Sequence, residues 1–478
     1  MGPWLALALL ALFRVFLDKD AGLPSVDSDY GVHLALAFKM RELDVFPPPY
    51  RGMLLSHTLA ALLSLLMDGP KAWLLLRDFS VLGTAAGIGY SAHVLGRPGR
   101  GFIASSLFFV LGLFYAGSMT EKGFLPQLVA WPFYAWALAF AIADRIHAKA
   151  RPLRTTLFFA LGILCYPDQA IWVGPALAVL ARNRFALLAA LSVSLVLLFS
   201  QARLTHLHGQ VSFPGASWIQ IVISVSFLLA AVWNARELGH FWLALAAAYV
   251  VAVVAVAATS YVVNSQVEFP LPRISYYARK NLYAFAMIAP FLILGIAEAR
   301  WARWMALFAG LPVALNFTLL LPVSWRQIPS LYVLPRSSDF SAEDETCADE
   351  LKRRARAESC DRYFVLPGSA RRGADREAHA GAIIRSYAYN ALSGVIKGDM
   401  TVRDLPLGAW RFGELQSELE ARFGSLSPTE RLAEIERVFD PARAYRCFFY
   451  PLAWGKEKTP SVAACDGNRS PFLLNVRR

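Results

Sequence analysis

The chain has 478 residues, of which 56% are hydrophobic and only 17% are charged. Soluble domains average about 45–50% apolar and about 25% charged residues, so this composition argues against an ordinary water-soluble enzyme. The net charge of +12 suggests a nucleic-acid partner, but much of the positive charge lies in short loops between apolar blocks. Charge in such loops orients membrane helices, so we expect membrane lipids as partners and no nucleic acid.

The apolar residues form blocks that approach or reach the length needed to cross the hydrocarbon core of a membrane. About 11 transmembrane helices are predicted, at 3–17, 73–95, 101–116, 125–143, 153–165, 168–181, 185–200, 217–234, 240–262, 282–298 and 304–322. The first block lacks the basic flank and cleavage site of a signal peptide, so we expect it to remain as a helix. These helices define a predicted transmembrane domain over residues 1–322.

The first connection, residues 18–72, is long and is predicted to lie on the periplasmic side. Its segment 52–67 contains Ser56 and His57 and falls short of bilayer thickness, so we interpret it as an interfacial helix. With a cytoplasmic N-terminus, the later basic loops then face the cytoplasm, as the positive-inside rule requires. If 52–67 were a span, the same loops would lie outside. The loops carry Arg97, Arg100, Arg145, Lys149, Arg151, Arg154, Arg182, Arg184, Arg236, Arg300 and Arg303.

One apolar run, from Thr155 to Leu180, is interrupted by Tyr166, Pro167 and Asp168. Proline cannot continue the hydrogen-bond ladder of a helix, and an aspartate is costly in lipid. The sequence therefore predicts a hairpin of two short helices with its tip in a polar cavity. Asp168 is a candidate substrate-binding residue because ionisable groups at membrane depth are usually functional.

The hydrophilic tail, residues 323–478, is predicted to be a separate soluble periplasmic α/β domain. A helix is expected over 341–358 and a strand over 363–366, followed by further helices. Four of the five cysteines lie in this tail, whereas Cys165 falls in a predicted membrane helix. An even number of cysteines in one soluble region indicates two disulfides and an oxidising compartment. Three connectivities are possible among Cys347, Cys360, Cys447 and Cys465, and we favour the local pairs 347–360 and 447–465.

The first predicted periplasmic loop contains Asp27, Asp29 and His33, close to the preceding membrane helix. A carboxylate seated by a following helix can act as a general base toward a sugar or lipid hydroxyl. Aspartate is also a favoured N-cap, so Asp27 or Asp29 could simply begin the helix from residue 30 to 43. Both interpretations remain open on the residues alone.

The stretch Asp29-Tyr30-Gly31-Val32-His33, followed by a helix and then Pro47-Pro48-Pro49-Tyr50, resembles the first periplasmic loop of a superfamily of glycosyltransferases. This is the GT-C superfamily of polyprenyl-phosphate-dependent enzymes, which includes protein O-mannosyltransferases and lipid A aminoarabinose transferases. The resemblance implies that Asp29 is the catalytic base, with His33 one helical turn further on. Tyr30 stands where many members have Glu, and Asp27 competes with Asp29 for the role of base.

Further charged residues are candidates for substrate binding. Glu121 and Lys122 lie at the outer end of two predicted spans, where they could hold a phosphate or a divalent cation, or form an ordinary surface ion pair. Arg273, Arg279 and Lys280 lie in a predicted outer loop, against the positive-inside trend. Such cations suit a departing lipid phosphate, although they could also contact anionic headgroups. The sequence predicts no metal-binding residues and no defined cofactor. A divalent cation is the one candidate for a cofactor.

Taken together, these features predict a multi-pass enzyme of the bacterial inner membrane. It would transfer a sugar, with inversion, from a polyprenyl-phosphate donor to a glycan, lipid or protein acceptor at the periplasmic face. The alternatives are a cell-envelope polysaccharide polymerase or ligase, which usually relies on arginines in late loops, and a lipid-linked glycan transporter. Transporters tend to contain internal repeats and short termini, which this sequence does not show.

Overall fold

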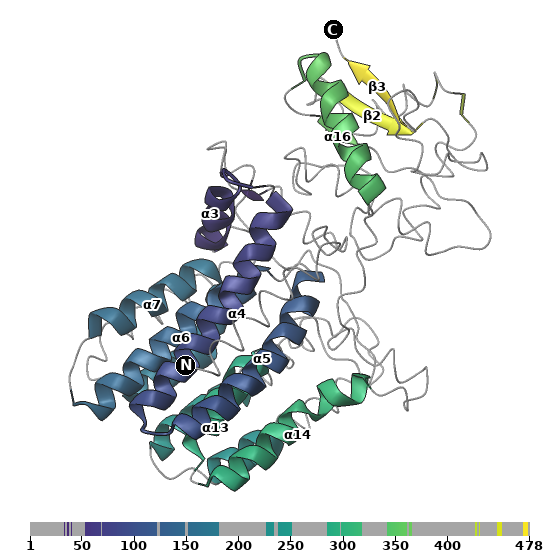
Figure 1. Ribbon diagram of the computed structural model, residues 1–478. Helices are drawn as coiled ribbons and strands as arrows, with labels where there is room; N and C mark the ends of the chain where they lie inside the picture. Colours follow the sequence, from purple (N-terminus) through teal and green to yellow (C-terminus); the bar gives the residue numbers. More distant parts are fainter. Residues whose placement is uncertain are drawn as a thin grey trace, which may run out of the picture.

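The computed structural model (Figure 1) describes residues 33, 36–37, 40, 53–67, 69–121, 125–148, 152–180, 226–233, 238–250, 284–296, 298–317, 342–360, 363–365, 426–427, 430, 447–451 and 472–476. Most of them are α-helical, as predicted. The principal helices are α3 (Leu54–Leu63), α4 (Gly69–Val94), α5 (Pro98–Glu121), α6 (Leu125–Ile146), α7 (Pro152–Cys165), α8 (Ala170–Leu180), α13 (Phe285–Gly295), α14 (Ala299–Phe317) and α16 (Ala342–Ala357).

The helices from α4 to α14 form a bundle in which α4 packs against both α5 and α6 (Figure 1). Helix α7 packs on α6, whereas α13 and α14 pack on α5. Small residues allow close approach: a Cβ atom at Gly87 of α4 would lie 3.3 Å from the backbone carbon of Ala135 in α6. Close backbone contact at small residues is typical of helices in lipid, where the hydrophobic effect does not drive helices together. Among the described helices, α6 is the one long and apolar enough to cross a membrane.

The predicted interruption of the run from 155 to 180 is confirmed. Helix α7 ends at Cys165, a short 3₁₀ turn, η2, covers Pro167–Gln169, and α8 begins at Ala170. Two residues of α6 satisfy polar groups at this break. The Tyr134 hydroxyl donates a hydrogen bond of 2.9 Å to the carbonyl of Tyr166, and the Gln169 amide contacts the carbonyl of Gln127 at 3.4 Å. These two hydrogen bonds hold the break against α6. They pair polar groups that an uninterrupted helix would pair within its own backbone.

The core of the described helices is mainly apolar but also contains polar side chains, and several large apolar side chains lie on the outside. Its buried polar residues are Ser56, His57, Arg77, Ser80, Thr84, Ser91, Ser105, Gln127, Thr155 and Gln169. Large apolar side chains are exposed on the outside of several helices, among them Leu62 and Leu66 near α3, Leu153, Leu157 and Leu164 on α7, and Trp301, Trp304 and Leu307 on α14. The described bundle thus presents apolar side chains outward over an interior that contains polar groups.

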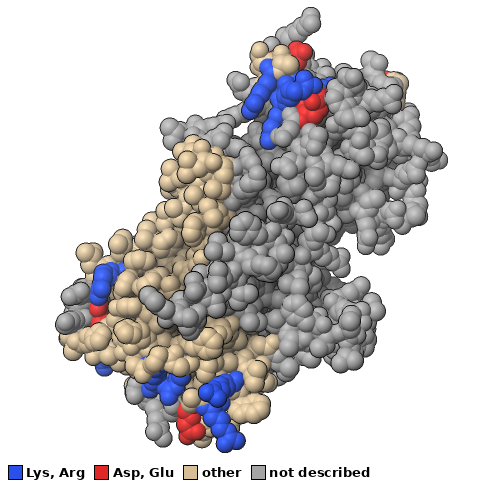
Figure 2. Space-filling view, in the orientation of Figure 1, with Lys and Arg blue, Asp and Glu red and all other residues tan. Residues whose placement is uncertain are grey.

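Most of the described charged residues of the bundle lie near one end, whereas the Arg77–Asp78 pair of α4 lies apart from them. Helices α4, α6 and α13 end there and α5, α7 and α14 begin there, and Figure 2 shows blue and red atoms grouped at that end below a largely tan surface. Arg97 donates a hydrogen bond of 2.7 Å to the carbonyl of Leu294, in the last turn of α13. Arg154 forms an ion pair of 3.3 Å with Asp144, across the α6–α7 connection. These cations tie helix ends together, and lysine or arginine at a helix C-terminus also complements its dipole.

The described part of the tail contains α16 and a three-stranded sheet of β1 (Tyr363–Val365), β2 (Cys447–Pro451) and β3 (Phe472–Val476). Strand β1 pairs in parallel with β2, which pairs antiparallel with β3. Helix α16 lies within the predicted helical run of 341–358. It ends with Ser359 in a left-handed conformation, at φ 54°, and the Cys360 N–H bonds to the carbonyl of Ala355 at 2.8 Å. This is a Schellman-type ending, which turns the chain back toward the sheet.

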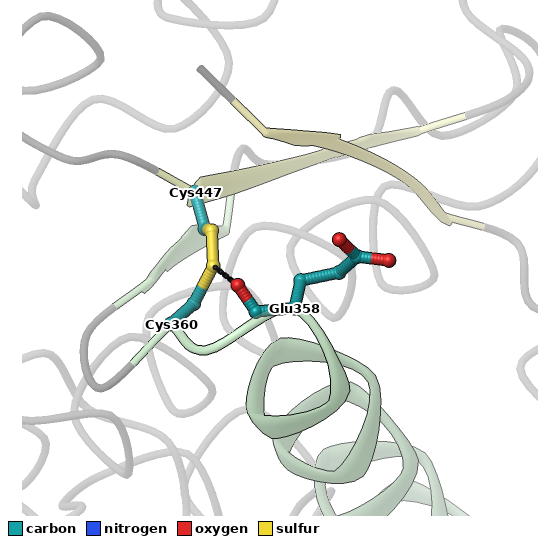
Figure 3. Close-up of a disulfide and its surroundings, with 3 residues drawn as sticks. All are labelled: Glu358, Cys360 and Cys447. Atoms are coloured by element: carbon teal, nitrogen blue, oxygen red, sulfur yellow. Dashed lines mark hydrogen bonds between the residues drawn. A yellow bond between two sulfur atoms is a disulfide. The ribbon is translucent and has the colours of Figure 1, made fainter. Parts of the chain in front are cut away.

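The disulfide connectivity differs from the favoured local pairing. Cys360 is bonded to Cys447, 87 residues away, with their Cα atoms 6.1 Å apart (Figure 3). The pairing follows from the sheet: Tyr363 of β1 is the register partner of Cys447, and Cys360 lies three residues before Tyr363. The predicted pairs 347–360 and 447–465 are therefore wrong. Cys165 is a buried free cysteine in α7, as expected.

Candidate functional site

The central feature of the site is a buried pair of histidines from two separate segments. His33 and His57 lie at 6% and 0% exposure, and the Nδ1 atom of His33 is 2.9 Å from the Nε2 atom of His57. Helix α3, which carries His57, buries Ser56 and His57 and exposes Leu54 and Leu62. The helix is thus arranged to bring a polar side chain to the bundle rather than to water.

Trp73, in the first turns of α4, forms one wall of this histidine pair. Its ring meets His57 edge-on, with centroids 5.6 Å apart, and lies 6.1 Å from the ring of His33. The Trp73 side chain is fully buried, and its Nε1–H has no hydrogen-bond partner among the described residues. A buried indole normally pairs its N–H, so this group is one donor available within the site.

The proton positions on His57 follow from its contact with the helix backbone. Its Nδ1 atom lies 2.7 Å from the carbonyl oxygen of Met53, and the Ser56 hydroxyl donates to the same oxygen at 2.8 Å. A carbonyl oxygen can only accept, so Nδ1 of His57 carries a proton. Burial lowers the pKa of His57 from 6.5 to about 4, because an imidazolium would lose its hydration, while the Met53 contact opposes the shift.

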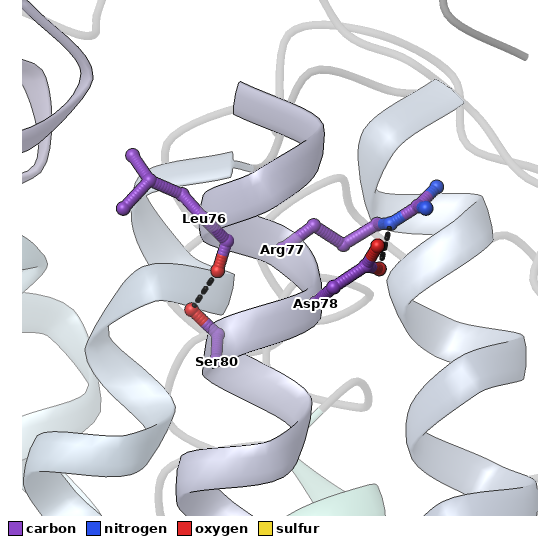
Figure 4. A network of polar contacts seen from close by, with 4 residues as sticks. All are labelled: Leu76, Arg77, Asp78 and Ser80. Carbon is purple, nitrogen blue, oxygen red and sulfur yellow. Dashed lines mark hydrogen bonds and ion pairs between the residues drawn. The ribbon is translucent and has the colours of Figure 1, made fainter. Parts of the chain in front are cut away.

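A buried ion pair lies one turn further along α4 (Figure 4). The Arg77 guanidinium, 3% exposed, donates from Nε to a carboxylate oxygen of Asp78 at 2.8 Å. Both side chains project from the same side of α4, whereas the Ser80 hydroxyl bonds back to the carbonyl of Leu76 at 2.6 Å. Since Arg77 follows Trp73 by four residues, both belong to the same face of α4.

The site lies at the end of the bundle opposite the basic loops. Helix α3 contacts the start of α4 as well as α6 and α7, and α7 leads into the break at Pro167. Helix α5 ends at Glu121 and α6 begins at Leu125, so this connection also belongs to that end. The end of α5 and the break after α7 therefore belong to the same end of the bundle as α3.

Of the predicted site residues, the structure describes the side chain of His33 and brings it into the histidine pair. The backbone of Glu121 ends α5, and Asp168 lies in η2. The side chains of these two residues lie outside the described part of the chain. Also outside it are Asp27, Asp29, Lys122, Arg273, Arg279 and Lys280. In the residues that the structure describes, no group of three or more histidine, cysteine or acidic side chains could hold a metal ion.

Sequence reasoning did not identify His57, Trp73 or Arg77 as site residues. A histidine inside the apolar run Leu54–Leu63 is the one local signal for His57, since such a run normally excludes polar groups. Arg77 gave a similar signal as a charge within a predicted span. Comparison of the chain with protein-family models and with curated proteins found no match.

Proposed function

We propose that this chain is a membrane glycosyltransferase that moves a sugar from a polyprenyl-phosphate donor to an acceptor at the periplasmic face. The observation that carries the proposal is the buried polar site formed by His33, His57 and Trp73 at one end of an apolar-faced bundle. The site joins the predicted first outer loop to an interfacial helix and to the start of a membrane helix. An enzyme acting on a lipid-linked sugar needs such a place, where a polar reaction centre meets an apolar carrier.

The large apolar side chains on the outside of the bundle support a membrane location. Exposed leucines and tryptophans on α3, α7 and α14 would be unfavourable in water but suit lipid. Trp301 and Trp304 accompany Arg300 and Arg303 in the first turns of α14, a combination typical of a membrane–water interface. At ten residues, α3 is about 15 Å long, about half the hydrocarbon thickness, so it suits an interfacial position. With the basic loops inside, the histidine site faces outward.

The roles of the remaining candidates follow from the chemistry of the transfer. Asp29 takes the proton from the acceptor hydroxyl as the oxygen attacks the anomeric carbon. The bond from that carbon to the phosphate oxygen breaks, and the electron pair stays on the phosphate. Arg273, Arg279 and Lys280 stabilise this developing negative charge. Asp29 precedes His33 by four residues, and Glu121 and Asp168 belong to elements that reach the same end of the bundle.

The proposal is tested with the full-length protein in membrane vesicles supplied with polyprenyl-phosphate-linked sugars and acceptor extract. The measurement is acceptor-dependent release of polyprenyl phosphate, with transfer of the labelled sugar. Asp29→Asn should lower this rate by at least about 100-fold, because general-base catalysis contributes about that much or more. Asp27→Asn should have a much smaller effect.

Asp144→Asn is the matched control, since Asp144 lies at the opposite end of the bundle and pairs with a partly exposed arginine. It should leave the transfer rate unchanged. Wild-type activity in Asp29→Asn would overturn the assignment of the base. If wild-type protein moves the lipid-linked sugar across the membrane without transferring it, the protein is a transporter and the proposed reaction is wrong.

A further inference from the structure

Helices α5 and α14 pack side by side and run in the same direction from the end of the bundle that carries the basic loops (Figure 1). Arg97 donates to the carbonyl of Leu294, so the start of α5 lies beside the end of α13, which α14 follows after a short connection. Further along, a Cβ atom at Gly310 of α14 would lie 4.0 Å from Cδ1 of Leu107 in α5. This contact fixes the register of the two helices.

The register places one arginine of each helix at the same level of the bundle. Arg100 lies seven residues before Leu107, and Arg303 lies seven residues before Gly310. Seven residues are close to two helical turns, so each arginine belongs to roughly the same face of its helix as the residue that makes the contact. Arg100 and Arg303 are therefore neighbours across the two helices.

Two more arginines extend this pair toward the end of the bundle. Arg97 and Arg300 precede Arg100 and Arg303 by three residues each. Arg300 and Arg303 are exposed and form no ion pair with a described residue. In the first turns of the two helices and the described residues just before them, Glu298 is the one acidic side chain. This corner of the bundle is thus strongly positive, and arginine holds a phosphate well because its N–H groups can bind two oxygens at once.

An apolar stripe continues along α14 from these cations. Trp301 and Trp304 are 51% and 60% exposed, and Leu307 and Phe308 follow at 64% and 38%. The opposite face of α14 is buried in the bundle, at Ala302, Met305 and Ala309. Cations, then tryptophans, then aliphatic and aromatic side chains match the order of headgroup, interface and acyl chain in a lipid.

We propose that the starts of α5 and α14 form a binding site for an anionic phospholipid of the cytoplasmic leaflet. Arg300 and Arg303 bind its phosphate, Arg97 and Arg100 add positive charge beside it, and its acyl chains lie along the exposed stripe of α14. The site lies at the end of the bundle opposite the histidine pair. The inference rests on the membrane location in the proposed function, but not on sugar transfer.

A lipid matches this surface better than a soluble anion or a second copy of the chain. A free phosphate would use the arginines alone and leave the apolar stripe of α14 uncovered. A second copy related by a two-fold axis would bring the same cations into its own interface, where like charges repel. A phospholipid supplies both the countercharge and the apolar cover.

The test is a titration of full-length protein in non-ionic detergent with phosphatidylglycerol or phosphatidylcholine, followed by native mass spectrometry of the bound lipid. The wild-type chain should bind phosphatidylglycerol at least about fivefold more tightly than phosphatidylcholine. Arg300→Gln and Arg303→Gln should each weaken the binding of phosphatidylglycerol about fivefold, the effect of one cation at an anionic lipid surface. The double variant should lose the preference for the anionic lipid.

Arg145→Gln is the matched control, since it removes an exposed arginine at the same end of the bundle, in the last turn of α6. It should stay within about twofold of wild type. An equal loss in Arg145→Gln would show that the charge of the whole end attracts the lipid, and the proposed site would be wrong. Equal binding of the two lipids by the wild-type chain would overturn it as well.

Two further measurements identify the occupant. Trp304→Ala should weaken the binding of phosphatidylglycerol about threefold, because the lipid loses apolar contact area. Inorganic phosphate at the same concentration should not displace the lipid. Displacement by phosphate, no effect of Trp304→Ala, or a dimer that buries Trp304 would each overturn the proposal. Specific binding of phosphatidylglycerol by a chain that transfers no sugar would contradict the proposed function alone.

Discussion

At the residue scale, the burial of His57 links stability to pH. Its pKa of about 4 in the folded chain lies below the value of 6.5 for an exposed histidine. The unfolded chain therefore binds more protons between these values, and folding stability should fall as the pH is lowered from about 6.5 to about 4. A shift of this size corresponds to about 3 kcal/mol.

The measurement is the free energy of unfolding in detergent as a function of pH. His57→Gln should remove the slope that this histidine contributes within the window, whereas His93→Gln should retain it. An unchanged slope in His57→Gln would show that His57 is not the group that titrates there.

The buried pair of Arg77 and Asp78 leads to a second prediction. Asp78→Asn removes the countercharge 2.8 Å from a guanidinium that is 3% exposed, so it should lower the free energy of unfolding by about 2 kcal/mol. Asp144→Asn breaks a pair whose arginine is 38% exposed and should cost less than about 1 kcal/mol. Denaturation of the two variants in the same detergent compares them. Equal effects would contradict the burial argument.

Single residues were predictable where their chemistry was unusual for their place in the sequence. His33 was identified through the short motif around Asp29, and the pattern of apolar residues marked His57 as lying in an interfacial helix. Their contact was not predictable, because the two residues are 24 positions apart and belong to separate segments that meet only in the folded chain. Trp73 and Arg77 become part of the site for the same reason.

At the element scale, the close packing of α6 and α7 depends on Gly162. A Cβ atom at this position would lie 2.9 Å from the ring of Tyr134, whose hydroxyl holds the carbonyl of Tyr166. Gly162→Ala should therefore destabilise the bundle by about 1–3 kcal/mol. Gly99→Ala, near the start of α5 with open space around the new Cβ, should be neutral or stabilising, since alanine favours helix formation. Thermal unfolding in detergent measures both, and a neutral Gly162→Ala would show that α7 can shift away.

Elements set by local chemistry were predicted well. The proline break between α7 and α8 appeared where expected, at a proline followed directly by an aspartate. A proline alone does not end a helix in this chain, since Pro132 lies inside α6 and Pro290 inside α13. The predicted spans at 73–95 and 101–116 were shorter than α4 and α5, since apolarity ends before the helical hydrogen bonds do. The disulfide was mispredicted because it depends on the pairing of β1 with β2, whose partners lie far apart in the sequence.

At the scale of the whole molecule, the disulfide provides a test of the proposal that the tail lies outside the cytoplasm. When the protein is isolated from membranes without a reducing agent, its digest should contain a peptide linked through Cys360 and Cys447. The same chain made in a reducing cytosol should not give this linked peptide. Cys360→Ser and Cys447→Ser should each destabilise the tail by about 2–5 kcal/mol. Mass spectrometry and proteolysis measure these outcomes. Reduced cysteines in the isolated protein would place the tail inside the cell.

The same bond closes a large covalent ring, from residue 360 at the end of α16 to residue 447 at the start of β2. A single peptide cut inside that ring leaves both fragments attached to each other, so the tail would still migrate as one piece on a non-reducing gel. Only a thiol reagent would release them. A nicked tail could therefore keep its strands β1 and β2 side by side, and damage to the backbone in this stretch would go unnoticed until the bridge is opened.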